Sequence, residues 1–120
     1  MSEEQILNLI KSGENSRVEF KSEQFRNESL AKEIVAFANM KGGKILVGIE
    51  DNGEITGVKN PHLLMEKIIL ICRNNIQPSL IPELISISYE DKFILMIEVE
   101  KGHCKPYKVK SLNRYYIRAD

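Results

Sequence analysis

The sequence predicts an α+β fold, in which helices cover a mostly antiparallel or mixed sheet. Apolar residues recur at helical spacing in residues 27–40 and 60–76, and they alternate in residues 85–99 as they do in paired strands. A chain of 120 residues is long enough for one hydrophobic core. We therefore expect residues 1–120 to form a single domain.

The first third of the chain predicts a short helix, a strand and a longer helix. In "SEEQILNLIKSGE", the apolar residues Ile6, Leu7 and Ile10 fit an amphipathic helix that ends at Gly13. The segment "SRVEFK" is expected to form the first strand. Residues 27–40 carry a wide apolar stripe, which is typical of a helix buried on much of its surface.

The glycines that follow this helix raise the question of a phosphate-binding loop. Gly42 and Gly43 come after a helix and before a strand, which is the reverse of the order in a Walker A loop. Their amides would lie at the negative end of the helix, which repels anions. We therefore expect structural glycines and no ATP site, with Gly48 marking a bulge or a close backbone approach. "KILVGIE" and "EITGV" are predicted to pair as a hairpin across Asp-Asn-Gly.

The second half predicts another helix and two strand pairs. Asn60 is suited to cap a helix and Pro61 to occupy its first turn. Residues 85–99 predict a hairpin, and "PYKVKSLNRYYIRAD" predicts two short strands around Ser-Leu-Asn. The sequence stops soon afterwards without a polar tail, so we expect the chain to be one domain of a longer protein.

Composition excludes several classes of protein. No apolar run approaches the roughly 18 residues that span a bilayer, and "MSEEQ" lacks the features of a signal peptide. We therefore expect a cytoplasmic protein without membrane contact. Cys72 and Cys104 form no CxxC pair, and His62 and His103 are isolated, so neither a disulfide nor a zinc site is predicted.

Charge is distributed unevenly along the chain. Residues 101–120 contain six of the 17 Lys and Arg but only one of the 17 Asp and Glu. Tyrosines are interleaved with these basic residues, a composition expected where a protein meets nucleic acid. The alternative is a solvated hairpin whose lysines keep an edge strand from aggregating. Charge alone leaves both interpretations open.

Three segments in order resemble one known family: "ENSRVEFK", "EIVAFANMKGGKILVGIEDNGEITGV" and "PYKVKSLNRYYIRAD". They are similar to the Alba-like domain of Schlafen proteins and of bacterial transcriptional regulators related to helicases. Some of these relatives have been labelled divergent AAA-type ATPases, but this chain has no Walker loop. The resemblance implies a nucleic-acid-binding module, with DNA as the first expectation, that is usually followed by further domains and can contact them.

The resemblance also implies a set of carboxylates. Schlafen members with nuclease activity use three acids, which correspond here to Glu14, Glu19 and Asp51, with Glu50 beside the last. Such acids would hold Mg²⁺ or Mn²⁺ for phosphodiester cleavage. Schlafen nuclease cores also pair two lobes, so a homodimer would have to supply the second lobe.

The same acids also have a structural interpretation. Glu19 could pair with Lys21 or Lys44, and Asp51 could order its turn through an Asx-type bond. Glu14 could be a solvated residue after the first helix. No cofactor is expected unless the nuclease alternative holds.

A nucleic-acid surface would use basic side chains to neutralise phosphates and aromatic side chains to stack on bases. Tyr107, Tyr115 and Tyr116 are the candidates for stacking, although one residue of an adjacent pair in a strand points inward and at least one tyrosine is expected in the core. No recognition helix is predicted, so sequence specificity is not expected. The candidate phosphate-binding residues are Arg17, Lys21, Lys41, Lys44, Lys105, Lys108, Lys110, Arg114 and Arg118.

The main prediction is a nucleic-acid-binding domain of a transcriptional regulator that contacts mainly the phosphate backbone as a homodimer. The first alternative is a metal-dependent nuclease of the Schlafen type. The second is a dimerisation or protein-interaction module whose basic segment docks on other domains of the parent protein.

Overall fold

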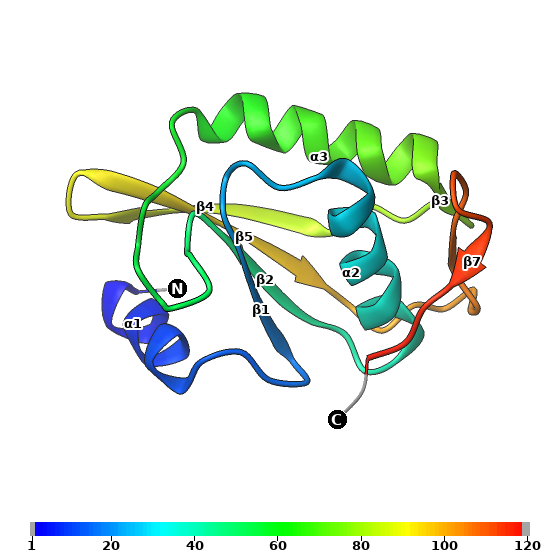
Figure 1. Cartoon of the computed structure of the whole chain (residues 1–120), viewed down its shortest axis with the longest axis horizontal. Helices are drawn as coiled ribbons and strands as arrows, with labels where there is room; N and C mark the ends of the chain where they lie inside the picture. The colour runs from blue at the N-terminus through cyan, green and yellow to red at the C-terminus, as the bar shows by residue number, and fades with distance from the viewer. Residues whose placement is uncertain (1, 119–120) are drawn as a thin grey trace.

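The computed structural model describes residues 2–118, which form three helices and two sheets (Figure 1). The helices are α1 (Glu3–Ser12), α2 (Asn27–Asn39) and α3 (Pro61–Asn75). The strands are β1 (Val18–Lys21), β2 (Gly43–Val47), β3 (Ile76–Gln77), β4 (Glu83–Tyr89), β5 (Lys92–Val99), β6 (Lys108–Val109) and β7 (Arg114–Tyr115). The predicted α+β class is confirmed.

The larger sheet has the strand order β1-β2-β5-β4. β1 runs parallel to β2, while β5 is antiparallel to both of its neighbours, so the sheet is mixed. The smaller sheet has the order β3-β6-β7 and is antiparallel. It lies beside the C-terminal ends of α2 and α3, at the opposite end of the molecule from α1 (Figure 1).

Hydrophobic residues fill both faces of the larger sheet. On one face, α2 and α3 pack against side chains of β2 and β5 such as Ile45 and Ile97. On the other face, Ile6 of α1 packs against Leu46 and Ile94. All five of these side chains are fully buried. The molecule therefore has a helix–sheet–helix arrangement in which β1 and α2 meet at one edge.

Sequence signals place the helix ends correctly. Ser2 and Gln5 form a capping box at the start of α1, and Gly13 ends this helix. The Asn60 side chain accepts a hydrogen bond from the Leu63 amide at the start of α3. The predicted hairpin of residues 85–99 and the short strand pair around Ser-Leu-Asn are both present. Among residues 2–118, no helix is long and apolar enough to cross a bilayer.

The glycine pair has a structural role. Gly42 adopts a φ of 77° and donates its amide to the Phe37 carbonyl at 2.8 Å, which closes the end of α2. At Gly43 an added Cβ would lie 2.3 Å from the Phe37 ring. A side chain there would therefore displace the core, and the local geometry explains the glycines without a phosphate.

The predicted hairpin of residues 44–58 is wrong in its second strand. β2 ends at Val47, and residues 54–58 contribute only a single bridge, between Ile49 and Ile55. Gly48 (φ 102°) turns the chain, and its carbonyl accepts the amides of both Thr56 and Gly57. The chain therefore folds back closely at Gly48, as the predicted close approach requires, while β2 pairs with β1 and β5.

Candidate nucleic-acid interface and carboxylate cluster

The smaller sheet is a compact unit built from the C-terminal segment. Its β6–β7 turn is closed by Asn113, which has a φ of 51° and whose side chain accepts a hydrogen bond from the Lys108 ammonium. Asn75, the last residue of α3, accepts the Lys110 amide with its carbonyl and the Ser111 amide with its side chain. The turn is thereby fixed to the end of α3.

Asn39, the last residue of α2, fixes the same unit from the other side. Its side-chain nitrogen donates to the carbonyl oxygens of Tyr107 and Tyr116 at 2.9 and 2.8 Å. Its side-chain oxygen accepts the Tyr107 amide at 2.6 Å. One helix-terminal side chain thus positions the strand that enters the small sheet and the segment that leaves it.

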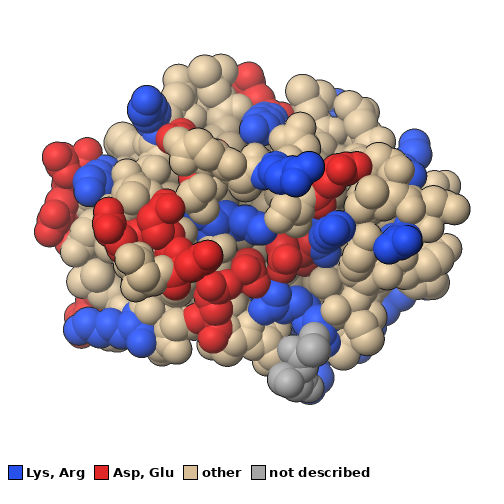
Figure 2. All heavy atoms as spheres, viewed as in Figure 1, with Lys and Arg blue, Asp and Glu red and all other residues tan. Residues whose placement is uncertain are grey.

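Four of the predicted phosphate-binding residues are exposed on or near this unit. They are Lys105, which precedes β6, Lys110 and Arg114 on either side of the β6–β7 turn, and Lys41, which follows α2 and lines a hollow with Arg17 and Arg118. Figure 2 shows basic side chains across the whole of this face, whereas most acidic side chains gather at the centre and on the side away from the small sheet. On this face, the side that carries the small sheet therefore differs from the other side mainly in having fewer acidic side chains.

The other predicted basic residues have partners within the chain, which differ from residue to residue. Lys21 donates to the Ser29 hydroxyl at 2.6 Å, and Lys44 lies 3.6 Å from a Glu98 carboxylate oxygen. Lys108 bonds to Asn113 as described above, while Arg17 donates to the Gly42 carbonyl and Arg118 pairs with acids. Arg17 is also exposed, but these contacts hold the side chains against the protein, so Lys41, Lys105, Lys110 and Arg114 form the more accessible set.

The three candidate tyrosines differ in exposure. Tyr107 is only 4% exposed and belongs to the core, so its predicted base stacking is wrong. Tyr116 packs against the same core and has the Lys32 ammonium 5.5 Å from its ring centroid. Tyr115 is 58% exposed and is the tyrosine of the adjacent pair that points outward. It lies next to Arg114 in β7, where a base could stack on it.

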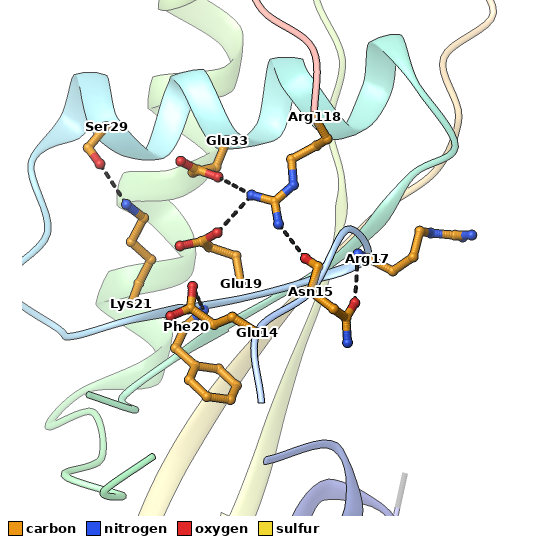
Figure 3. Close-up of polar contacts among 9 residues, drawn as sticks. All are labelled: Glu14, Asn15, Arg17, Glu19, Phe20, Lys21, Ser29, Glu33 and Arg118. Atoms are coloured by element: carbon orange, nitrogen blue, oxygen red, sulfur yellow. Dashed lines mark hydrogen bonds and ion pairs between the residues drawn. The ribbon is translucent and has the colours of Figure 1, made fainter. Parts of the chain in front are cut away.

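The predicted carboxylates lie at the other end of the C-terminal segment, where β1 meets α2 (Figure 3). Arg118 occupies the centre of this cluster. One guanidinium nitrogen donates to Glu19 at 2.7 Å and to Glu33 at 2.9 Å, and the other donates to the Asn15 carbonyl. The guanidinium carbon lies 4.5 Å from the centroid of the Phe37 ring. Arg118 therefore supplies the positive charge that these acids require.

Glu14 and Glu19 point toward one another (Figure 3) and perturb each other's titration. Partial desolvation, together with the hydrogen bond and negative charge of Glu19, raises the pKa of Glu14 to about 7. Burial by itself would raise the pKa of Glu19, but hydrogen bonds from Glu14 and Arg118 outweigh burial and lower it. Desolvation and the charge of Glu19 raise the pKa of Glu33. The surroundings of this pair thus favour the protonated form of Glu14 and the ionised form of Glu19.

Asp51 joins this region without joining the hydrogen-bonded cluster. Its negative charge contributes to the raised pKa of Glu14, and it lines a hollow of about 320 Å³ together with Glu19 and Glu50. Within residues 2–118, however, no group of three His, Cys, Asp or Glu side chains is placed to hold a metal ion. Because Arg118 already neutralises Glu19, the arrangement shown by the structure does not fit a bound Mg²⁺ or Mn²⁺.

The structural interpretation predicted an ion pair for Glu19 and an Asx-type bond in the turn. Both interactions are present, but they involve residues other than those predicted. Glu19 pairs with Arg118, and the Asx-type bond of the turn is made by Asn52, which accepts the Glu54 amide at 2.9 Å. Sequence reasoning missed Glu33 and Asn39. The signal available for Glu33 was a carboxylate among the buried positions of a largely apolar helix.

Comparisons with known proteins agree with this fold. The chain superposes on the solution NMR structure of the N-terminal domain of an ATP-dependent DNA helicase RecG-related protein from Nitrosomonas europaea with a TM-score of 0.80 and 23% identity, covering 100% of this chain and 90% of that domain. It also superposes on the crystal structure of the DIP2311 protein from Corynebacterium diphtheriae with a TM-score of 0.68 and 24% identity, covering 97% of this chain.

This chain spans only 24% of the DIP2311 chain. No curated protein matches the sequence. The model of one protein family, Schlafen AlbA_2, matches residues 14–120, which include the carboxylate cluster and the basic small sheet. The chain belongs to the Schlafen AlbA_2 family.

Proposed function

We propose that this chain is a nucleic-acid-binding domain of a transcriptional regulator that contacts the phosphate backbone of DNA through its small sheet. The observation on which the proposal depends is the exposed basic surface formed by Lys105, Lys110 and Arg114, with Tyr115 exposed beside it. Lysine and arginine bind phosphate by charge and release counterions, while an exposed tyrosine can stack on an unpaired base.

The rigidity of this surface supports the proposal. Asn39 and Asn75 hold the small sheet to the ends of two helices through side-chain hydrogen bonds of 2.6–2.9 Å. A basic surface that is fixed in this way loses less conformational freedom on binding than a flexible tail does. The name of the Nitrosomonas europaea neighbour also refers to a DNA helicase, which supports DNA as the first ligand to test.

The experiment is fluorescence anisotropy with labelled single- and double-stranded DNA and RNA over a series of salt concentrations, without divalent metal. We expect binding that weakens steeply as salt increases. Combining Lys110→Ala with Arg114→Ala should weaken binding and lower the salt dependence by about one unit of slope for each lost phosphate contact.

The matched control removes two exposed lysines from the opposite end of the molecule, by Lys11→Ala combined with Lys59→Ala. It should leave the affinity nearly unchanged, because these positions lie far from the small sheet. If both double variants weaken binding equally, the interaction depends on overall charge and the proposed surface is wrong. If no probe binds even at low salt, the chain is not an autonomous nucleic-acid-binding domain.

The nuclease alternative has one supporting feature, the hollow that Glu19, Glu50 and Asp51 share. It predicts cleavage of the probes when Mg²⁺ or Mn²⁺ is added, and loss of this cleavage in Asp51→Asn. We expect no such cleavage, since Arg118 already pairs with the carboxylates of Glu19 and Glu33. Metal-dependent cleavage that Asp51→Asn abolishes would overturn that expectation.

A further inference from the structure

The two edges of the larger sheet are protected unequally. β1, at one edge, is four residues long and carries Glu19 and Lys21. β4, at the other edge, is seven residues long, and between Leu84 and Ser88 it has no charged residue and no proline. Exposed edge strands are usually blunted by charge, proline or a bulge, because their free backbone groups pair with other chains. β4 lacks these protections.

The hairpin geometry shows which backbone groups of β4 are free. Tyr89 and Lys92 pair across a two-residue turn, and the closing pair of such a hairpin is hydrogen-bonded. Hydrogen-bonded pairs then recur at every second residue of β4, so that Leu84, Ser86 and Ser88 direct their N–H and C=O groups away from β5. Within residues 2–118, no strand pairs with this side of β4.

The side chains at this edge favour an apolar partner on one face. Ile85 and Ile87 pair with Met96 and Ile94 of β5 and belong to the face of the sheet that α1 covers. Ile87 is 5% exposed, whereas Ile85 is only partly buried. A further strand beside β4 would therefore extend this core and cover the remaining surface of Ile85.

We propose that β4 pairs with β4 of a second copy of this chain, antiparallel and centred on Ser86, so that the two larger sheets become one continuous sheet. In this register Ser86 faces Ser86 of the second copy, and Leu84 faces Ser88. All of these are the residues whose backbone groups point outward, so every outward N–H finds a C=O.

The same register also satisfies the side chains. Ile85 faces Ile87 of the second copy, an apolar cross-strand pair that adds to sheet stability. Glu83, the one charged residue of β4, faces Tyr89 of the second copy. A parallel arrangement would instead place the two Glu83 carboxylates side by side, and like charges at this spacing are destabilising. Antiparallel self-pairing thus gives the outward backbone groups hydrogen-bond partners and keeps the two Glu83 carboxylates apart.

The test is the mass of the chain in solution, measured by sedimentation velocity over a series of protein concentrations. We expect the mass of the wild type to approach that of a dimer, twice the chain mass of 13.8 kDa, as the protein concentration increases. Ser86→Lys and Ser86→Glu should each remain monomeric, because each places two like charges opposite one another at the centre of the interface. Mixing the two variants should restore the dimer, since lysine then faces glutamate.

Ser79→Lys is the matched control, because Ser79 is exposed and lies outside the strand. It should dimerise like the wild type. Circular dichroism and thermal unfolding check that both Ser86 variants keep the fold, which is expected because lysine is common on edge strands. A wild type that stays monomeric throughout the series would overturn the proposal, as would a mixture that fails to dimerise while the wild type does. Neither result depends on nucleic-acid binding.

Discussion

Two arginines of the C-terminal segment, Arg114 and Arg118, lie in regions of opposite character. Arg114 is exposed on β7, beside Tyr115 and other basic side chains. Arg118 is largely buried at the edge of the larger sheet, between Glu19 and Glu33 and over the Phe37 ring. In the sequence alone, both are positive charges of one basic segment and cannot be distinguished. Acids on β1 and α2, distant in sequence, make one of them structural and leave the other accessible.

The largest expected effect is a difference in the free energy of unfolding when each of these two arginines is replaced by alanine. Arg118→Ala leaves Glu19 and Glu33 without their cation and should lower the free energy of unfolding by about 3 kcal/mol. Arg114→Ala should change it by less than about 0.5 kcal/mol, because the side chain is exposed. Urea denaturation of both variants measures the difference. An Arg118→Ala variant as stable as the wild type would show that the cluster does not depend on this arginine.

A smaller loss of stability is expected from a substitution at Asn39, whose side chain joins the end of α2 to the small sheet. Asn39→Ala removes three hydrogen bonds to the backbone of Tyr107 and Tyr116 and should lower the free energy of unfolding by about 2 kcal/mol. Nucleic-acid affinity should also fall, since the small sheet loses its support. Asn39→Asp keeps the acceptor for the Tyr107 amide and removes both donated bonds. Its stability should lie below that of the wild type, and equal stability would contradict the role assigned to the side-chain nitrogen.

The smallest effect concerns pH and belongs to the carboxylate cluster alone. The pKa of Glu14 is raised from 4.5 to about 7 in the folded chain, so this group stabilises the fold fully below pH 4.5 and loses that contribution as pH rises through 7. Glu14→Gln keeps an oxygen that can accept the Phe20 amide and cannot ionise.

We therefore expect the melting temperature of Glu14→Gln to fall less than that of the wild type between these pH values, and to exceed it above pH 7. Thermal unfolding over this pH range measures both curves. Parallel curves for the two proteins would mean that Glu14 titrates normally. Glu100→Gln provides a comparison at an exposed acid whose charge does not contribute to the raised pKa of Glu14.

Local signals in the sequence were sufficient for most of the secondary structure. Asn60 and Pro61 marked the start of α3, and Gly13 marked the end of α1, because caps and breakers act on their immediate neighbours. Alternation placed the β4–β5 hairpin, whose strands are adjacent in sequence. The order of Gly42 and Gly43 relative to the helix was enough to predict a structural role, which the contact with Phe37 confirms.

Contacts between distant segments were not predictable in the same way. The parallel pairing of β1 with β2 and the pairing of β2 with β5 join strands separated by a helix or by tens of residues, and they displaced the expected hairpin. The burial of Tyr107 and the pairing of Arg118 with Glu19 also depend on elements far away in sequence. Residue type shows what a side chain can do, while the fold determines which partner it meets.

The most direct test of the central claim is an NMR titration of the ¹⁵N-labelled chain with a short DNA oligonucleotide at low salt. The account predicts that the largest amide shifts fall in β6, β7 and the turn between them, around Lys110, Arg114 and Tyr115. The amides near Glu14, Glu19 and Asp51 should move least, because acidic side chains repel phosphate. Shifts concentrated at that carboxylate cluster, with the small sheet unchanged, would contradict the assignment of the small sheet as the nucleic-acid-binding surface.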